Sequence, residues 1–182
     1  LGTDIPTIAF INRRAISAGA LISLSCDSIF MTPGATIGAA TAVDAEGKKA
    51  SEKVISYMRE EMASTAEANN RYRHVAIDMV DEELSIDFML NMEGDTLTAE
   101  DVEGFAEGKL ITLSTQLAVQ LGIAGGEFGS IEEVLKYLEL EDAEQKDMEE
   151  SWSEKLVRFL TNPVVAPLFM SLGMLGLFME IK

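Results

Sequence analysis

The sequence predicts an α/β fold with parallel strands, and three segments near the beginning of the chain lead to this prediction. TIAFI (7–11) is a continuous run of β-branched, aromatic and other apolar residues, which is typical of a buried strand. AISAGALISLSC (15–26) predicts a short, mostly buried helix, and SIFMT (28–32) predicts a second strand. Because strands joined through a helix usually pair in parallel, this order indicates a layered α/β domain.

Turn residues and helical periodicity predict the remaining elements of the domain. In chain order they are an extended small-residue segment (35–43), two helices (52–73 and 74–84), a turn-rich hairpin (85–114) and two short helices (114–124 and 130–140). Ser130 and Glu133 fit the spacing of a capping box, in which two side chains satisfy the free N–H groups of a helix start.

Three regions follow from this pattern: a compact domain (1–138), an acidic linker (139–154) and an apolar helix (155–182). Between Arg158 and Glu180 lie 21 uncharged residues. A helix needs about 20 apolar residues to cross the hydrocarbon core of a bilayer, so we expect membrane association. The alternatives are an apolar helix that packs on the domain or lies in the membrane interface. Because a short turn leads straight into the first strand, we also expect the natural N-terminus to lie upstream.

The charge and the reactive residues narrow the classes of function. A formal net charge of −17 leaves no basic stripe for a nucleic-acid backbone. Cys26 is the single cysteine and His74 the single histidine, which excludes an internal disulfide and leaves little for a metal site. We therefore expect no metal, no cofactor and no nucleic acid.

Ser17 is the candidate nucleophile, although a structural serine in a buried helix would fit the same local pattern. A helix start favours a nucleophile because its N–H groups stabilise negative charge, and Ala18 and Gly19 leave room for a substrate. A serine requires a base, and a neutral lysine can act as one. Lys53 opens a predicted helix, where the positive dipole end favours loss of its proton. His74 and a purely solvated lysine are the alternatives.

Two sequence blocks resemble the nucleophile region of the NfeD family of membrane-bound serine proteases. The first is AISAG (15–19), and the second is TPGATIGA (32–39). EKVISYMREEMASTAEANNR (52–71) is similar to the family's helix that begins with a lysine and ends near an arginine, here Arg71. The resemblance continues through GKLITLSTQLAVQLGIAGG (108–126) and into the apolar segment at 152–178. The family is of the ClpP class and similar to signal peptide peptidase A.

The resemblance implies a ClpP/crotonase-like fold and a Ser-Lys dyad. Ser17 would be the nucleophile and Lys53 the base, while the Ala18 N–H would bind the oxyanion. The backbone around Gly34, Ile37 and Gly38 would pair with a substrate as an added strand. The implied partners are a peptide or protein substrate, a stomatin-like membrane protein, further copies of this chain and the cell membrane.

Asn12, Arg13 and Arg14 stand where many members of the family carry small residues, which bears on substrate preference near the nucleophile. Two other functions remain open at the level of sequence. One is a non-catalytic scaffold of the same fold that organises a stomatin-like partner, and the other is a crotonase-like acyl-CoA enzyme. Both predicted dyad positions are filled, which favours the protease.

Overall fold

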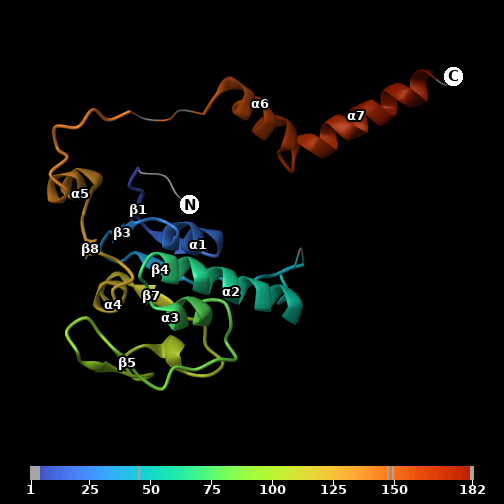
Figure 1. The fold of residues 1–182 in the computed structure, drawn as a ribbon. Coiled ribbons are helices and arrows are strands. Elements are labelled where there is room, and N and C mark those ends of the chain that lie inside the picture. Colours follow the sequence, from blue (N-terminus) through green and yellow to red (C-terminus); the bar gives the residue numbers. More distant parts are fainter. Residues whose placement is uncertain (1–4, 45, 147, 149, 181–182) are drawn as a thin grey trace. The chain divides into compact units, whose positions relative to one another are not determined.

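A computed structural model describes residues 5–44, 46–146, 148 and 150–180 of the chain (Figure 1). The chain divides into two compact units, one ending at Glu141 and the other beginning at Asp142. They are described separately below.

The first sheet of the first unit contains β1 (Ile8–Ile11), β3 (Ser28–Met31) and β8 (Gly126–Glu127) in the order β1-β3-β8. All neighbours in this sheet are parallel. The predicted parallel pairing of the first two strands is therefore correct, and the domain has the expected α/β character.

The second sheet contains β2 (Arg14–Ile16), β4 (Thr36–Gly38) and β7 (Thr112–Ser114), with β4 in the middle. β4 is parallel to β2 and antiparallel to β7. The prediction of a helix from residue 15 is wrong at its beginning, since Ala15 and Ile16 belong to β2 and the helix α1 covers Ala18–Leu24. Ala15 is buried and pairs with Ile37, so the strand is stabilised by a sheet partner far along the chain.

Helices and a hairpin complete this unit. They are α2 (Glu52–Ala68), α3 (Arg73–Asp78), the hairpin of β5 (Met89–Leu90) and β6 (Thr96–Leu97), the 3-10 turn Glu103–Phe105, α4 (Thr115–Gln120) and α5 (Ile131–Tyr137). α2 packs against α1 and α3 (Figure 1) and buries Ile55, Met62, Ala63 and Ala66 along one face. α2 ends before the predicted residue 73, where Asn70 takes a positive φ of 56°.

Arg71 fixes the end of α1 from inside the protein. Its buried guanidinium donates hydrogen bonds to the carbonyl oxygens of Leu24, Cys26, Asp27 and Ile123, at 2.9 to 3.3 Å. These acceptors come from the end of α1, the loop before β3 and the segment before β8. The arginine that the sequence placed at the close of a helix therefore joins three segments of the domain.

The second unit contains α6 (Trp152–Thr161) and α7 (Val165–Glu180). Their axes differ by 70° across the break at residues 162–164, where Pro163 cannot donate a backbone hydrogen bond. Within the described residues no single helix is long and apolar enough to cross a membrane, although the bent pair meets the criteria together. The expectation of one continuous apolar helix from residue 155 is therefore wrong.

Candidate active site

Ser17 stands between β2 and α1 in a backbone conformation that L-amino acids rarely adopt. Its φ is 55° and its ψ is −125°, and its side chain is exposed. A sharp strand-to-helix turn of this kind presents a nucleophile at the edge of a sheet. Because such conformations cost about 1 to 3 kcal/mol, they persist where the surrounding structure enforces them.

The surroundings that enforce this turn are backbone groups from distant segments. The N–H of Ser17 donates to the carbonyl oxygens of Gly38 (3.3 Å) and Ala39 (3.1 Å). The N–H of Ala39 in turn donates to the carbonyl oxygen of Ile111 at 3.0 Å. Gly38 has a φ of 139°, and a Cβ there would lie 2.9 Å from Thr112 Cα and closer still to the carbonyl of Ile111. Only glycine therefore permits this close approach of β4 and β7 beside the serine.

The backbone N–H of Ala18 is available for an oxyanion. Ala18 is the first residue of α1 and is exposed, and no described residue accepts a hydrogen bond from its N–H. The N–H that follows a nucleophile is a recurring oxyanion donor at turns of this kind.

The lysines near the site differ in their acidic partners. Lys48 is exposed and pairs with Glu46 at 2.9 Å. Lys49 pairs with Glu82 and Glu83, both at 3.2 Å. The hydrogen bond to Glu83, together with Glu82, raises the pKa of Lys49 above its usual value, so that amine is a poor base.

Lys53 lies in the first turn of α2, and its side chain is exposed. The Lys53 ammonium group makes no ion pair or hydrogen bond with the described part of the chain, and neither does the Ser17 hydroxyl. The structure thus does not join Lys53 Nζ to Ser17 Oγ by a hydrogen bond, nor does it enclose the two in a dry cleft.

The predicted substrate-binding residues lie beside Ser17, but they do not form a free strand edge. β4 contains Ile37 and Gly38, and its two edges are taken by β2 and β7. Both residues are buried. The expectation that they pair with an added strand is therefore wrong for this sheet, because β7 occupies the position. Gly34 is exposed in the preceding turn, with a φ of 76°.

A groove of about 470 Å³ lies near the turn at Ser17, since Ala15 and Gly19 on either side of this serine are among its lining residues. It is lined by β1, the turn after it, β2 and α1, and its lining includes Arg13, Arg14, Gly19 and Ile22. Ile22 is 64% exposed. The groove is thus an open surface with an apolar wall and two guanidinium groups.

Two buried carboxylates escaped the sequence analysis. Asp78 and Asp81 are only 3% and 2% exposed. Asp81 pairs with Arg59 at 2.7 Å, whereas Oδ2 of Asp78 has no hydrogen-bond partner in the described structure. Burial, together with the charge of Asp81, raises the pKa of Asp78 to about 6.

The signal that would have found these carboxylates is the segment AIDMVD (76–81), because aspartates three apart in an apolar helix share one face. The segment also reaches the site through its backbone. The Met79 carbonyl accepts from the Ala40 N–H at 2.6 Å, and the Val80 carbonyl accepts from the Thr41 hydroxyl at 2.6 Å.

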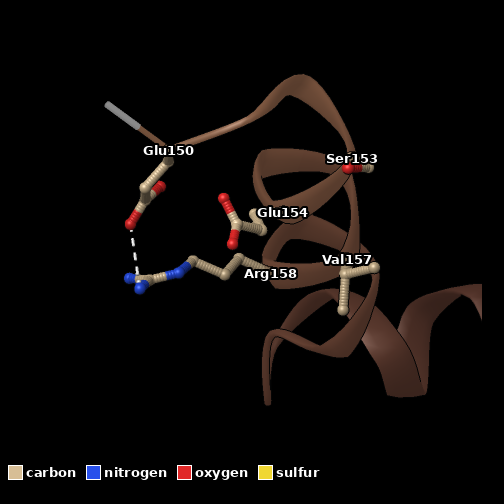
Figure 2. Close-up of a pocket in the computed structure, with 5 residues that line it drawn as sticks. All are labelled: Glu150, Ser153, Glu154, Val157 and Arg158. Carbon is tan, nitrogen blue, oxygen red and sulfur yellow. Dashed lines mark ion pairs between the residues drawn. The ribbon is translucent and has the colours of Figure 1, made fainter. Parts of the chain in front are cut away.

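A second hollow, of about 390 Å³, lies on α6 in the other unit (Figure 2). It is lined by Glu150, Ser153, Glu154, Val157 and Arg158. Figure 2 shows the Arg158 guanidinium reaching toward Glu150, with which it forms an ion pair at 2.8 Å. The Arg158 charge in this hollow is therefore neutralised by Glu150. Ser17 remains a better candidate nucleophile than Ser153, the serine that lines the hollow.

Comparisons with known proteins bear on the fold and the family of the chain. The solved structures of the 1510-N membrane-bound stomatin-specific protease share the fold: the lysine-to-alanine variant with a substrate peptide has a TM-score of 0.60 at 20% identity, over 87% of this chain and 71% of that one. A 1510-N structure from Pyrococcus horikoshii, a membrane protease specific for a stomatin homologue, has a TM-score of 0.51 at 19% identity, over 87% and 69% of the two chains.

A curated relative is much more similar in sequence. The membrane protein NfeD1b of Bacillus subtilis (strain 168) is 36% identical over 179 residues. The match covers 98% of this chain and 38% of that protein, so this chain spans well under half of the relative's length. The family described as NfeD1b, N-terminal domain, matches residues 1–148, and the chain therefore belongs to the NfeD1b family.

Proposed function

We propose that this chain is the proteolytic part of a membrane-bound serine endopeptidase with a ClpP/crotonase-like fold. The observation that carries the proposal is the backbone of Ser17, which has a φ of 55° and presents an exposed hydroxyl between β2 and α1. A serine held in a conformation suited to glycine serves no evident packing purpose. The shared fold with 1510-N structures supports the proposal.

In the proposed mechanism, Ser17 Oγ attacks the scissile carbonyl and Lys53 Nζ accepts the hydroxyl proton. The Ala18 N–H binds the oxyanion of the tetrahedral intermediate. The lysine then gives the proton to the leaving amine, and water hydrolyses the acyl-enzyme. The reaction requires Lys53 Nζ within about 3 Å of Ser17 Oγ, and hydrogen bonds of this kind often form only with substrate bound. Lys53 fits the role because, unlike Lys48 and Lys49, it has no acidic partner among the described residues.

Membrane-associated proteins are the proposed substrates, and a stomatin-like protein is the proposed partner, because the 1510-N protease is described as specific for a stomatin homologue. We also propose that the chain forms homo-oligomers. α6 and α7 would attach it to the cell membrane, since nearly all their large apolar side chains are exposed. Gly34 would contact the substrate from its exposed turn, while Ile37 and Gly38 shape the site through their backbone.

A fluorophosphonate probe, which reacts with activated serines, tests the proposal directly. The wild-type chain should be labelled and Ser17→Ala should not, with peptide mapping locating the adduct on Ser17. Ser25, which is half-buried and lies in the same region, provides the matched control, because Ser25→Ala should keep full labelling. Equal labelling of wild type and Ser17→Ala would remove Ser17 from the mechanism.

The base is tested by replacing lysines one at a time. Lys53→Ala should lower the rate of probe labelling and of peptide cleavage by at least about a hundredfold, since general-base catalysis contributes about 10²- to 10⁴-fold. Lys48→Ala removes a nearby exposed lysine and should leave both rates within about twofold, a margin smaller than any catalytic role. Similar rates for the two variants would assign the base to another group.

A non-catalytic scaffold is the second candidate, and the exposure of Lys53 is the observation that favours it. In that case neither labelling nor cleavage would depend on Ser17 or Lys53. Membrane recruitment of a partner would be the same for wild type and Ser17→Ala.

A further inference from the structure

We propose that Arg13 and Arg14 form a subsite that selects acidic residues of a polypeptide bound beside Ser17. This inference rests on the proposed function, because it names the class of substrate that the same site takes. Arg14 lies three positions and Arg13 four positions before the serine, at the turn that joins β1 to β2. Both side chains are exposed, and both line the groove of about 470 Å³.

These two arginines differ from the other four in the chain. Arg59, Arg73 and Arg158 each pair with carboxylates, and Arg71 is held by four backbone carbonyls. The guanidinium groups of Arg13 and Arg14 make no hydrogen bond or ion pair with any described residue. The chain has 31 acidic residues against 14 lysines and arginines, so acceptors are abundant elsewhere. Two guanidinium groups without a partner among the described residues therefore line one groove.

Arg14 lies on the exposed face of β2. Along β2 the side chains of Arg14 and Ile16 are exposed, and Ala15 between them is buried in the core. Alternation along a strand thus puts Arg14 on the outer face, and Gly19, two positions after Ser17, lines the same groove as both arginines. A guanidinium presents a planar set of donors that matches a carboxylate, so glutamate or aspartate is the side chain that this surface recognises best.

The apolar wall of the groove completes the description of the ligand. Ile22 on α1 and Ala9 on β1 contribute apolar surface to the same groove. The preferred ligand is therefore a peptide that combines acidic residues with aliphatic ones. A peptide that is only acidic would be repelled by the net charge of −17 and would lack apolar contacts.

Binding to Ser17→Ala tests the subsite without requiring turnover. The probe is a fluorescein-labelled peptide of leucine and alanine that carries glutamates, and its counterpart has glutamine at every glutamate. Fluorescence anisotropy should give a lower Kd for the glutamate peptide. Arg13→Gln and Arg14→Gln, each added to Ser17→Ala, should weaken its binding about fivefold, and both together about twentyfold. The preference should shrink when NaCl is raised from about 0.05 M to about 0.5 M, because salt screens exposed charges.

The control variant makes the same change of net charge elsewhere in this unit. Lys48→Gln with Lys136→Gln, again on Ser17→Ala, removes two exposed positive charges and should keep the glutamate preference. Circular dichroism should be the same for all variants, because the replaced side chains are exposed.

The inference is overturned if the two peptides bind equally, if neither binds, or if the lysine control loses the preference as fully as the arginine variant does. Probe labelling of Ser17 in the wild-type chain reports on the proposed function separately. Labelling without a glutamate preference would overturn the subsite alone, and a glutamate preference without labelling would overturn the protease alone.

Discussion

At the scale of single residues, Ser17 combines an exposed hydroxyl with a backbone that favours glycine. The φ of 55° follows from two hydrogen bonds that its N–H donates to Gly38 and Ala39. The strain is thus imposed by the sheet and α1, and it belongs to the position whatever side chain occupies it.

Replacing Ser17 by two different small residues separates strain from chemistry. Ser17→Gly should unfold at a higher urea concentration than Ser17→Ala, and its free energy of unfolding should be greater by about 1 kcal/mol. The reason is that relief of about 1 to 3 kcal/mol of strain exceeds the entropy cost of glycine. Both variants should be inactive. Far-UV circular dichroism in urea makes the measurement, and a midpoint for Ser17→Gly at or below that of Ser17→Ala would contradict the strain.

Asp78 makes the stability of the fold depend on pH. Its pKa is about 6 in the folded protein, above the ordinary value of 3.8, so the folded state binds this proton more tightly than the unfolded chain does. The contribution of Asp78 to the free energy of unfolding therefore decreases as pH rises from about 4 to about 6, and it stays low above that range.

Asp78→Asn should remove this dependence. It should change the free energy of unfolding little near pH 4 and raise it by about 2 to 3 kcal/mol at pH 7. Asp81→Asn should act in the opposite direction at pH 7, because it breaks the ion pair with Arg59. Urea unfolding across this pH range makes the comparison. If the free energies of unfolding of Asp78→Asn and wild type differ by the same amount at every pH, titration of Asp78 does not cause the pH dependence.

At the scale of elements, Arg71 holds α1 in place, and α1 begins directly after the nucleophile. Arg71→Ala should lower the free energy of unfolding by about 3 kcal/mol or more, because it leaves several buried carbonyls without donors. Arg71→Lys should recover only part of this, since an ammonium group cannot reach all four acceptors. Thermal unfolding measures the loss.

Arg73 provides the matched control two positions away. It pairs with Glu60 and Glu67 on the surface, so Arg73→Ala should cost less than about 1 kcal/mol. Equal losses for Arg71→Ala and Arg73→Ala would show that the buried network does not secure α1.

The strands and helices that local pattern specifies were predictable from the sequence. TIAFI and SIFMT became the parallel strands β1 and β3, and the helices at α2, α4 and α5 lie within the predicted ranges. The short strand β2 was missed, because RAISAG has helix-compatible residues and its strand partner, β4, lies about 20 residues further on. Tertiary pairing decided that segment against its local preference.

For the candidate site, the sequence singled out Ser17 as the candidate nucleophile but did not predict its surroundings. Ser17 and Ala18 follow from the local pattern and the resemblance. The contact of Ala39 with Ile111, which closes one edge of β4, depends on residues more than 70 positions apart. No local signal reports such a contact, and the expected strand pairing with substrate failed for that reason.

At the scale of the whole molecule, the proposed attachment of the second unit to a membrane can be tested directly. Trp152 is the only tryptophan of the chain, it opens α6, and it is 78% exposed. Adding phospholipid vesicles should shift its emission to the blue, because tryptophan prefers the membrane interface.

A charge in α7 should weaken this binding. Leu172→Lys should lower the vesicle affinity by at least about tenfold, since a lysine at the centre of an inserted helix costs about 2.5 to 3.5 kcal/mol. Leu172→Met keeps the apolar character and should bind like the wild type. If the emission wavelength of Trp152 does not change when vesicles are added, α6 does not bind the membrane surface.

The long-range closure around β4 also has a consequence during synthesis. The carbonyl of Ile111 that holds Ala39, and the strand β7 beside it, are translated nearly a hundred residues after Ser17. A growing chain on the ribosome thus carries Ser17 in an unformed turn until that strand has emerged. The strained backbone of Ser17 is therefore among the last features of the first unit to form during synthesis.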